Sequence, residues 1–284
     1  MLVTLNDILP AAKRDGYAVG LFNTVNFEMA RGVLQAAEAL RSPVIIGTAE
    51  VLLPYAPLQD LADLLKPMAE RASVPVVLHY DHGLTFDACM LALKYGFTSV
   101  MYDRSTCTYD ENLQSVAALT RIAHAFGASV EAELGHVGNA EGGAPETEEL
   151  DLALFYTNPE QAADYVAGTG VDALAIAVGS AHGAYRLPPK LDFDRITDIA
   201  SCIATPLVLH GGSGLTDEDF RHAIRCGISK VNIFTDINNA GIVGMQEGLA
   251  IGKHSVTDLI PYQVAAIRTA TEAKMRLFGS VGKA

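Results

Sequence analysis

The chain has 284 residues, half of them hydrophobic, and a formal net charge of −13 at pH 7. This length suits a single α/β barrel domain over residues 1–284, and the apolar content supplies a large core. The negative charge argues against nucleic acid and anionic membranes as partners, because both require a basic surface.

The N-terminus and the cysteines favour a cytoplasmic protein. Residues 1–16 contain no basic segment followed by an apolar one, so they predict no signal peptide. No apolar run approaches the ~18 residues of a membrane span. None of the cysteines forms a CxxC pair, and we expect all of them to be reduced thiols. They are Cys89, Cys107, Cys202 and Cys226.

The segment before residue 17 has the pattern of a helix that closes the bottom of the fold. Eight short apolar runs follow it, with segments of helical period between them. Apolar strands that alternate with helices predict a parallel sheet covered by helices. The runs span residues 17–23, 42–48, 74–82, 98–105, 129–135, 172–179, 205–212 and 229–236.

Eight strand–helix units in about 240 residues predict the (β/α)8 TIM-barrel class, in preference to an open doubly wound sheet. Residues 240–279 predict extra C-terminal helices, too long for one closing helix and suited to an oligomer contact. Between the fifth and sixth runs, residues 136–150 are rich in glycine and glutamate, which is typical of a mobile loop. This loop would lie on the catalytic face of the barrel.

Nearly every predicted strand ends at or near a residue that binds metals, donates hydrogen bonds or transfers protons. Chemistry in barrels sits at the C-terminal ends of the strands, and apolar packing gives no reason for this pattern. The residues concerned are Asn23, Thr48, Asp81, His82, Asp103, Glu133, His182, His210, Asn232 and Asp236.

Three histidines at corresponding strand ends, His82, His182 and His210, suit zinc. Three neutral imidazoles leave a fourth position open for water or substrate, as a catalytic site requires. A lone histidine would be explained better as a hydrogen-bonded core residue. Three at matching positions, with Asp103 and Glu133 adjacent in barrel order, favour a metal site.

The other histidines have simpler explanations. His79 lies inside the third run and is expected to be a satisfied interior residue. His124, His222 and His254 lie on or near predicted helices, and we expect them to be solvated. His136 opens the glycine-rich loop, and the sequence assigns it no role.

A second glycine-rich loop follows the seventh run. The glycines of residues 211–214 permit close backbone approach, and Thr216 or Asp217 is suited to cap the next helix. Backbone N–H groups there would cradle a phosphate. Barrels often bind phosphate after strands seven and eight, where Asn232 and Thr235 add donors. Many such loops only turn the chain, but this position favours phosphate binding.

Five motifs stand in a fixed order along the chain: "HYDHG", "VEAELGHVGN", "GSAHG", "LHGGSG" and "KVNIFTD". Their order and spacing resemble those of the class II, zinc-dependent fructose/tagatose-bisphosphate aldolases. The resemblance covers nearly the whole chain, from "FNTVNFEMARG" to "LFGS". It implies that the three strand-end histidines bind one catalytic Zn²⁺, and it allows a monovalent cation as a further cofactor.

The resemblance also implies roles for four acidic residues. Asp81 would be the proton donor and acceptor beside the zinc, and Asp103 and Glu133 would form a second or alternative metal position. The family's loop after strand five carries an acid that exchanges the α-proton of the ketone. Glu141 matches this acid by its offset.

A sugar phosphate is the small-molecule partner that the resemblance implies, with a homodimer or homotetramer as the assembly. Dihydroxyacetone phosphate would be held by the second glycine-rich loop and by the residues that follow strand eight. The implied substrate-binding residues are Asn23, Thr48, Gly183, Gly211, Gly212, Ser213, Asn232, Ile233, Phe234 and Thr235.

Two stretches depart from the family pattern. The chain has "MYDRS" where the family often has "MIDGS" or "MIDAS", which introduces Arg104. Arg104 is either a substrate contact or an outward partner of Asp110 or Glu111. Bisphosphate members carry an arginine in a "PR-x-Y"-like stretch, but here Pro261 is followed by Tyr262. The substrate is therefore expected to be a ketose 1-phosphate rather than a ketose bisphosphate.

Three other functions fit the residues less well. A Schiff-base aldolase needs a lysine at a catalytic strand end, but Lys230 is expected at the opposite end of the eighth strand. A barrel metallohydrolase has no need of a phosphate cradle, and the first run offers no histidine pair. A non-catalytic or regulatory sugar-phosphate-binding barrel needs no combination of Asp81, Glu133 and three metal-binding histidines. The predicted function is therefore a zinc-dependent aldolase that reversibly cleaves a ketose 1-phosphate, or as the less favoured alternative a ketose bisphosphate, into dihydroxyacetone phosphate and an aldehyde.

Overall fold

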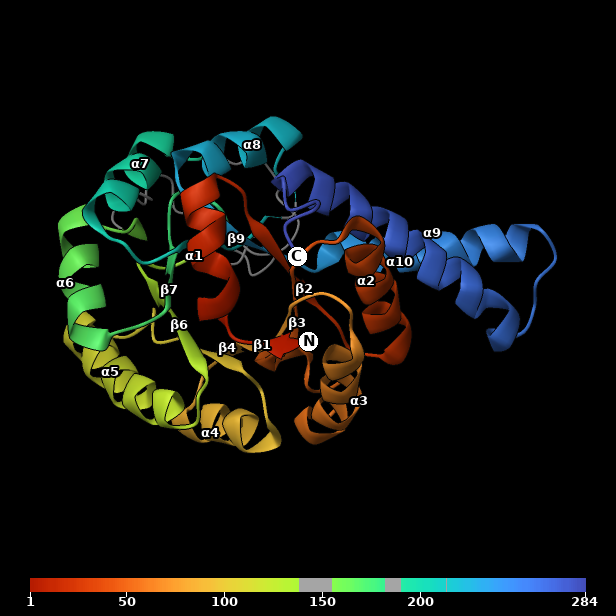
Figure 1. The fold of residues 1–284 in the computed structure, drawn as a ribbon, viewed down its shortest axis with the longest axis horizontal. Coiled ribbons are helices and arrows are strands. Elements are labelled where there is room, and N and C mark those ends of the chain that lie inside the picture. The colour runs from red at the N-terminus through yellow and green to blue at the C-terminus, as the bar shows by residue number, and fades with distance from the viewer. Residues whose placement is uncertain (138–154, 182–189, 213) are drawn as a thin grey trace, which may run out of the picture.

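The computed structural model describes residues 1–137, 155–181, 190–212 and 214–284. Eight parallel strands form a closed barrel, because β2 pairs with both β3 and β9 (Figure 1). Each predicted run overlaps one strand, so the (β/α)8 prediction is confirmed. The strands are β2 (Val19–Asn23), β3 (Val44–Ala49), β4 (Val76–Gly83), β5 (Ser99–Tyr102), β6 (Ser129–Leu134), β7 (Ala173–Ile176), β8 (Leu207–Leu209) and β9 (Ile228–Ile233).

Helices surround the barrel, and a helix follows each of its strands in the chain (Figure 1). Their apolar faces pack on the outward side chains of the strands, such as Ile46 and Leu78. The helices are α2 (Phe27–Leu40), α3 (Leu58–Arg71), α4 (Phe86–Tyr95), α5 (Tyr109–Ala125), α6 (Pro159–Thr169), α7 (Phe193–Cys202), α8 (Asp217–Cys226), α9 (Thr235–Ala250) and α10 (Val256–Phe278), with a 3-10 turn, η1 (Glu50–Leu52), after β3.

The N-terminal end of the barrel is closed by β1 (Leu2–Val3) and α1 (Leu5–Asp15). In Figure 1, α1 lies across this end of the barrel. Leu5 and Leu9 are fully buried against inward side chains of the strands, among them Leu21 and Val77. The predicted helix at the bottom of the fold is therefore confirmed, and it seals this end from water.

The C-terminal helices α9 and α10 pair and extend away from the barrel (Figure 1). We call residues 235–278 the arm. A side chain on Gly244 would collide with the Tyr262 backbone, and one on Gly248 would crowd the Leu259 side chain, so both glycines favour this close pairing. The predicted extra helices are thus confirmed. Among the described residues, no helix has the length and apolarity needed to cross a membrane.

The barrel interior changes from apolar to charged along its axis. Alternate residues of a strand face the same side, and on β4 these are Val77, His79 and Asp81. Val77 belongs to the apolar layer on α1. His79 lies near Glu131 of β6, which pairs with Lys230 of β9. These three strands are not neighbours in the sheet, so the contacts cross the barrel interior. The charged layer leads to the C-terminal mouth.

Candidate active site

Two consecutive residues, Asp81 and His82, both reach the barrel mouth at the end of β4. In a regular strand they would point to opposite sides. However, His82 has a φ of 48°, and the pairing of β4 with β5 shifts register within residues 80–83. This bulge turns the imidazole toward His210 and Asp103. A left-handed histidine is strained, and such strain is typical of functional sites.

The imidazoles of His82 and His210 face each other, and a carboxylate holds the far side of each ring. His82 Nε2 lies 2.9 Å from His210 Nδ1. His82 Nδ1 is 2.8 Å from an Asp103 oxygen, and His210 Nε2 is 2.8 Å from a Glu131 oxygen. Carboxylates orient metal-binding histidines in this way. The 2.9 Å separation is near the ~3.3 Å expected between two nitrogens of a tetrahedral zinc site.

Ligand atoms of Asp81, His82 and His210 all lie within 4.8 Å of one another, which suits a metal ion. A side chain on Gly211 would collide with the Ala181 backbone, so the loops after β7 and β8 touch here. The chain therefore passes close to His210 just before the predicted third histidine. That histidine, His182, lies outside the described residues, as do Gly183, Ser213, Glu141 and most of the loop predicted at 136–150.

Asp103 and Glu133 adjoin this pair of imidazoles, and His82, Asp103 and Glu133 form a second group with metal-ligand spacing. One oxygen of Glu133 accepts a hydrogen bond from the Val137 N–H at 2.9 Å. The other is buried, has no hydrogen-bond partner within the described part of the chain, and lies 3.6 Å from His210 Nδ1. A buried orphan oxygen among metal-ligand groups fits a second metal position.

The pKa values of two carboxyl groups in the site, Glu133 and Asp81, are shifted in opposite directions. Burial, together with the nearby Asp103 charge, raises the pKa of Glu133 to about 8. Burial acts in the same direction on Asp81, but His82 and other positive neighbours hold the pKa of Asp81 well below its ordinary value. Burial would lower the pKa of His82, yet the carboxylates around it raise that pKa to about 9. Environments that push neighbouring pKa values apart are typical of acid–base sites.

Two asparagine side chains hold the Asp81 carboxylate. Asn23 Nδ2 donates to one oxygen at 2.8 Å, and Asn232 Nδ2 donates at 3.1 and 3.3 Å to the two oxygens. Both asparagines are among the predicted substrate contacts, and both lie at the barrel mouth. Their positions at strand ends did not predict that both would donate hydrogen bonds to Asp81.

Glu131 and Lys230, which lie beneath the site, were missed by sequence reasoning. Both are fully buried, and Lys230 Nζ lies 2.8 Å from a Glu131 oxygen. Burial would raise the pKa of Glu131, but the Lys230 ammonium and His210 lower it to about 2. Lys230 lies in the middle of β9 rather than at its far end. Strand alternation was the available signal, because Glu131 and Lys230 precede Glu133 and Asn232 by two residues.

The predicted phosphate cradle lies at the ends of β8 and β9. Gly211 has a φ of 65°, Gly211 and Gly212 are buried, and Gly212 lies close to Phe220 in α8. Thr216, one of the two residues predicted for this role, caps the N-terminus of α8. Phe234, at the N-terminus of α9, supplies no side-chain cap. The first N–H groups of α9 are thus not capped by that residue. A helix N-terminus of this kind is a suitable anion site.

Two predicted contacts are not brought into the cluster. Thr48 shares the strand face of Ile46, which packs toward the helices, and its hydroxyl has no hydrogen-bond partner among the described residues. The Arg104 guanidinium lies 5.6 Å from the ring centroid of Tyr102. The Tyr102 ring in turn packs against Phe86 of α4. This stacking favours the outward orientation of Arg104.

The remaining histidines behave largely as expected. His79 is buried, and its Nδ1 lies 2.7 Å from Ser99 Oγ, but its Nε2 has no hydrogen-bond partner among the described residues, so it is satisfied only in part. His136 is partly exposed and contacts Ser105 Oγ at 3.1 Å. Because Ser105 also donates to Asp103 at 2.7 Å, His136 is linked to the site.

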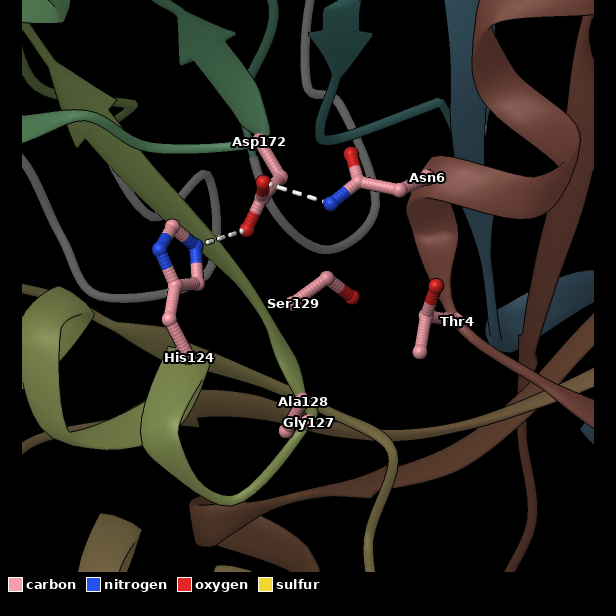
Figure 2. A pocket seen from close by; sticks show the side chains of 7 residues that line it. All are labelled: Thr4, Asn6, His124, Gly127, Ala128, Ser129 and Asp172. Atoms are coloured by element: carbon pink, nitrogen blue, oxygen red, sulfur yellow. Dashed lines mark hydrogen bonds and ion pairs between the residues drawn. The ribbon is translucent and has the colours of Figure 1, made fainter.

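A separate hollow of about 250 Å³ lies at the opposite, N-terminal end of the barrel (Figure 2). At its centre, Asp172 accepts hydrogen bonds from Asn6 at 2.7 Å, His124 at 2.8 Å and the Val130 N–H at 2.7 Å. Figure 2 shows the Asn6 and His124 side chains converging on the carboxylate. Residues at this end of a barrel serve stability, so we interpret the hollow as a structural junction.

Comparison with known proteins decides the family. A sequence profile described as "Fructose-bisphosphate aldolase class-II" matches residues 3–283. The chain belongs to this family. The resemblance noted from the five motifs is therefore confirmed, and the protein is a class II aldolase, an aldehyde-lyase. Class II aldolases act on sugar phosphates and use a divalent metal, and the groups of metal-ligand atoms at the barrel mouth agree with such a metal.

Individual relatives match over almost their whole length. The chain is 38% identical over 270 residues to "Uncharacterized protein YdjI" of Escherichia coli K12, covering 94% of each. It is 38% identical over 288 residues to a fructose-bisphosphate aldolase of Geobacillus stearothermophilus, covering 100% of this chain and 99% of the relative. The crystal structure of the YdjI aldolase from E. coli K12 matches with a TM-score of 0.89 and 34% identity over 100% of both chains.

The raised pKa of Glu133 predicts a pH-dependent stability in the metal-free protein. Its folded-state pKa of about 8 exceeds the ordinary 4.5, so between these values the folded state keeps a proton that the unfolded state releases. Stability from this group is therefore lost as pH rises. Between pH 5 and 6.5 the free energy of unfolding of the wild-type protein should fall by about 2 kcal/mol through this group, at ~1.4 kcal/mol per pH unit. The Glu133→Gln variant should not show this fall.

Chemical denaturation of chelator-treated protein at the two pH values measures this effect. Glu160→Gln, at an exposed position on α6, should leave the pH dependence unchanged. An identical slope for wild type and Glu133→Gln would contradict a protonated Glu133.

Proposed function

We propose that this aldolase depends on zinc and reversibly cleaves a ketose 1-phosphate into dihydroxyacetone phosphate and an aldehyde. The observation that carries the proposal is the pair of carboxylate-held imidazoles of His82 and His210, which face each other beside Asp81. We assign His182 as the third ligand, from its motif. Asp103 and Glu133 would provide the second or alternative metal position.

Zinc bound there would act as a Lewis acid for the carbonyl of the ketose. Asp81 would take the proton of the C4 hydroxyl during cleavage and return it during condensation. Its low pKa keeps it ionised, and the amides of Asn23 and Asn232 fix its two oxygens. Positioned acid–base groups of this kind typically contribute 10²–10⁴-fold to the rate.

The phosphate of the ketone half would bind where the loops after β8 and β9 meet. Gly211 and Gly212 allow close backbone approach, and residues 233–235 lead into the α9 N-terminus, which lacks a side-chain cap. Gly183 and Ser213 would complete the cradle. Holding one end of the substrate places the reacting carbons at the metal and lowers the entropic cost of reaction.

Two further roles come from the family resemblance. Glu141 would exchange the α-proton of dihydroxyacetone phosphate, and the loop at 136–150 would bring it to the metal site on closure. A monovalent cation is a further cofactor that the family allows. Both assignments are proposals, and Glu141 lies outside the described residues.

A Schiff-base mechanism is a poor alternative. The Lys230 amine is fully buried, lies 2.8 Å from a Glu131 oxygen and donates to Asn232 at 2.6 Å, so it is engaged by the protein rather than free to attack a carbonyl. A metallohydrolase or a non-catalytic sugar-phosphate-binding barrel would leave the combination of Asp81, the metal ligands and the phosphate cradle without a purpose.

We further propose a homodimer or homotetramer assembled through the arm. Large apolar side chains are exposed along it: Ile242, Val243, Leu249, Ile251 and Val256, each between 47% and 76% exposed. A helical pair of this kind, outside the barrel, buries these side chains only against another subunit. The four cysteines form no disulfide, which suits the cytoplasm as the compartment.

Removing a zinc ligand should remove both the metal and the activity. We expect His82→Ala and His210→Ala to purify with little bound zinc and to lose turnover, because two imidazoles cannot hold the ion. Metal analysis and an aldol-cleavage assay measure the two effects. His124→Ala, at the far end of the barrel, is the control. Full activity of a metal-free preparation would contradict zinc dependence.

Replacing the acid–base residue should separate binding from catalysis. Asp81→Asn keeps the size of the side chain but removes the charge that accepts the proton. We expect zinc content and KM to change little, and kcat to fall by ~10²–10⁴-fold. Steady-state kinetics on zinc-loaded protein test this. A variant in which only KM rises would make Asp81 a binding residue.

The substrate should carry one phosphate. Tyr262 follows Pro261 where bisphosphate members have an arginine, so we expect poor activity on fructose and tagatose 1,6-bisphosphates relative to a ketose 1-phosphate with a neutral or carboxylate tail. Arg104→Ala tests the substrate-contact alternative: the stacking on Tyr102 predicts no selective effect, whereas a selective loss of activity with acidic aldehydes would place Arg104 at the substrate. A condensation screen with dihydroxyacetone phosphate identifies the aldehyde. A kcat/KM of ~10⁴ M⁻¹s⁻¹ or more on either bisphosphate would refute this assignment.

A further inference from the structure

A fully buried ion pair lies directly beneath the metal and proton-transfer groups. Lys230 and Glu131 each have 0% exposure, and their charged atoms are 2.8 Å apart. Removing two charges from water is costly, and buried ion pairs are often no more stabilising than apolar residues of similar volume. Filling the barrel therefore does not explain this pair, and its hydrogen bonds indicate another role.

The two oxygens of Glu131 bind different partners. One lies 2.8 Å from Lys230 Nζ, and the other lies 2.8 Å from His210 Nε2. A carboxylate with this cation beside it only accepts hydrogen bonds, so His210 Nε2 carries the proton. The lone pair of the neutral ring is then on Nδ1, the atom that faces His82 Nε2 at 2.9 Å. Glu131 thus selects the tautomer that presents Nδ1 to a metal.

The Lys230 ammonium also fixes the orientation of Asn232. Lys230 Nζ donates to Asn232 Oδ1 at 2.6 Å, and an ammonium cannot accept in return. The amide is therefore held with Nδ2 toward Asp81, where it donates at 3.1 and 3.3 Å. A flipped amide would place its oxygen against the Asp81 carboxylate.

We propose that Lys230 and Glu131 form one positioning unit, in which Lys230 orients Glu131 and Asn232 so that His210 is set for the metal and Asp81 for proton transfer. The inference rests on the proposed zinc-dependent function. Neither residue needs to touch the substrate, so both are positioning residues rather than catalytic ones. Loss of such partners typically costs 10–100-fold in metal affinity or activity.

A double substitution separates positioning from simple core packing. Lys230→Met leaves the Glu131 charge without its cation, so we expect lower thermal stability, and zinc affinity and kcat each reduced 10–100-fold. Lys230→Met/Glu131→Leu removes both charges and should regain much of the stability. Its zinc affinity and kcat should stay low, because His210 Nε2 has lost its acceptor and Asn232 its donor.

Two measurements besides turnover report on the unit. Competition with a chromophoric chelator gives the zinc affinity of each variant. The ¹⁵N chemical shifts of His210 in metal-free protein give its tautomer, which should be the Nε2-protonated form in wild type and a mixture in the double variant. Glu131→Gln keeps the side-chain volume and should lower zinc affinity about tenfold, so it tests the unit even where the double variant folds poorly.

Lys13→Met is the matched control. Lys13 also has its amine held by the protein, through the carbonyls of Ile203 at 2.6 Å and Thr205 at 3.2 Å, but it lies on α1 at the far end of the barrel. Its loss should affect stability and leave the zinc affinity, the His210 tautomer and kcat unchanged.

The outcomes separate this inference from the proposed function. A double variant with wild-type zinc affinity, tautomer and kcat would show that the pair only fills the core, and would overturn the inference. Wild-type protein that binds no zinc would instead refute the proposed zinc dependence. In that case the tautomer of metal-free His210 still decides whether Glu131 and Lys230 position the ring.

Discussion

Compensation of buried charge is the constraint on which the active end of this barrel depends. Water is excluded from the layer that contains Glu131, Lys230 and His79, all of them fully buried. In such surroundings each charge needs a partner and each donor an acceptor. Glu131 meets this need by dividing its oxygens between an ammonium and an imidazole. His210 and Asn232 at the barrel mouth are hydrogen-bonded to this layer, through Glu131 and Lys230. A change in any one of these residues is therefore expected to affect several others.

The fold separates the end that supplies stability from the end that supplies chemistry. At the N-terminal end, α1 covers an apolar layer. There the Asp172 carboxylate accepts hydrogen bonds from Asn6, His124 and the Val130 N–H. At the other end, His82 adopts a left-handed backbone and Gly211 packs against the neighbouring loop. These are costly local conformations. The sealed core beneath them provides the stability that lets the strand ends keep such geometry.

Periodic features of this fold were predictable from the sequence, whereas local bends and the depth of a residue within a strand were not. The eight strands and the arm were predictable because apolar runs alternate with helical segments. His82, His210 and Asp103 were predictable because barrel chemistry sits at strand ends. Glu131 and Lys230 were missed because they lie within strands, where apolar side chains are expected. The bend at His82 has no sequence signal. Thr48 was expected to reach the substrate, a role that strand alternation does not favour. For Arg104 two orientations were left open, and the stacking on Tyr102 favours the outward one.

The way the site holds an anion bears on which substrates it admits. The chain carries a net charge of −13, so an anionic substrate approaches against the overall field. Backbone N–H groups at the glycine loop and at the start of α9 can hold one phosphate through fixed dipoles that need no side-chain cation. A second phosphate at the aldehyde end would require cations of its own to offset the same field. Arg104 follows β5 but stacks on Tyr102, and the position after Pro261 is occupied by a tyrosine. These features agree with the proposed substrate, a ketose 1-phosphate whose aldehyde end carries no phosphate.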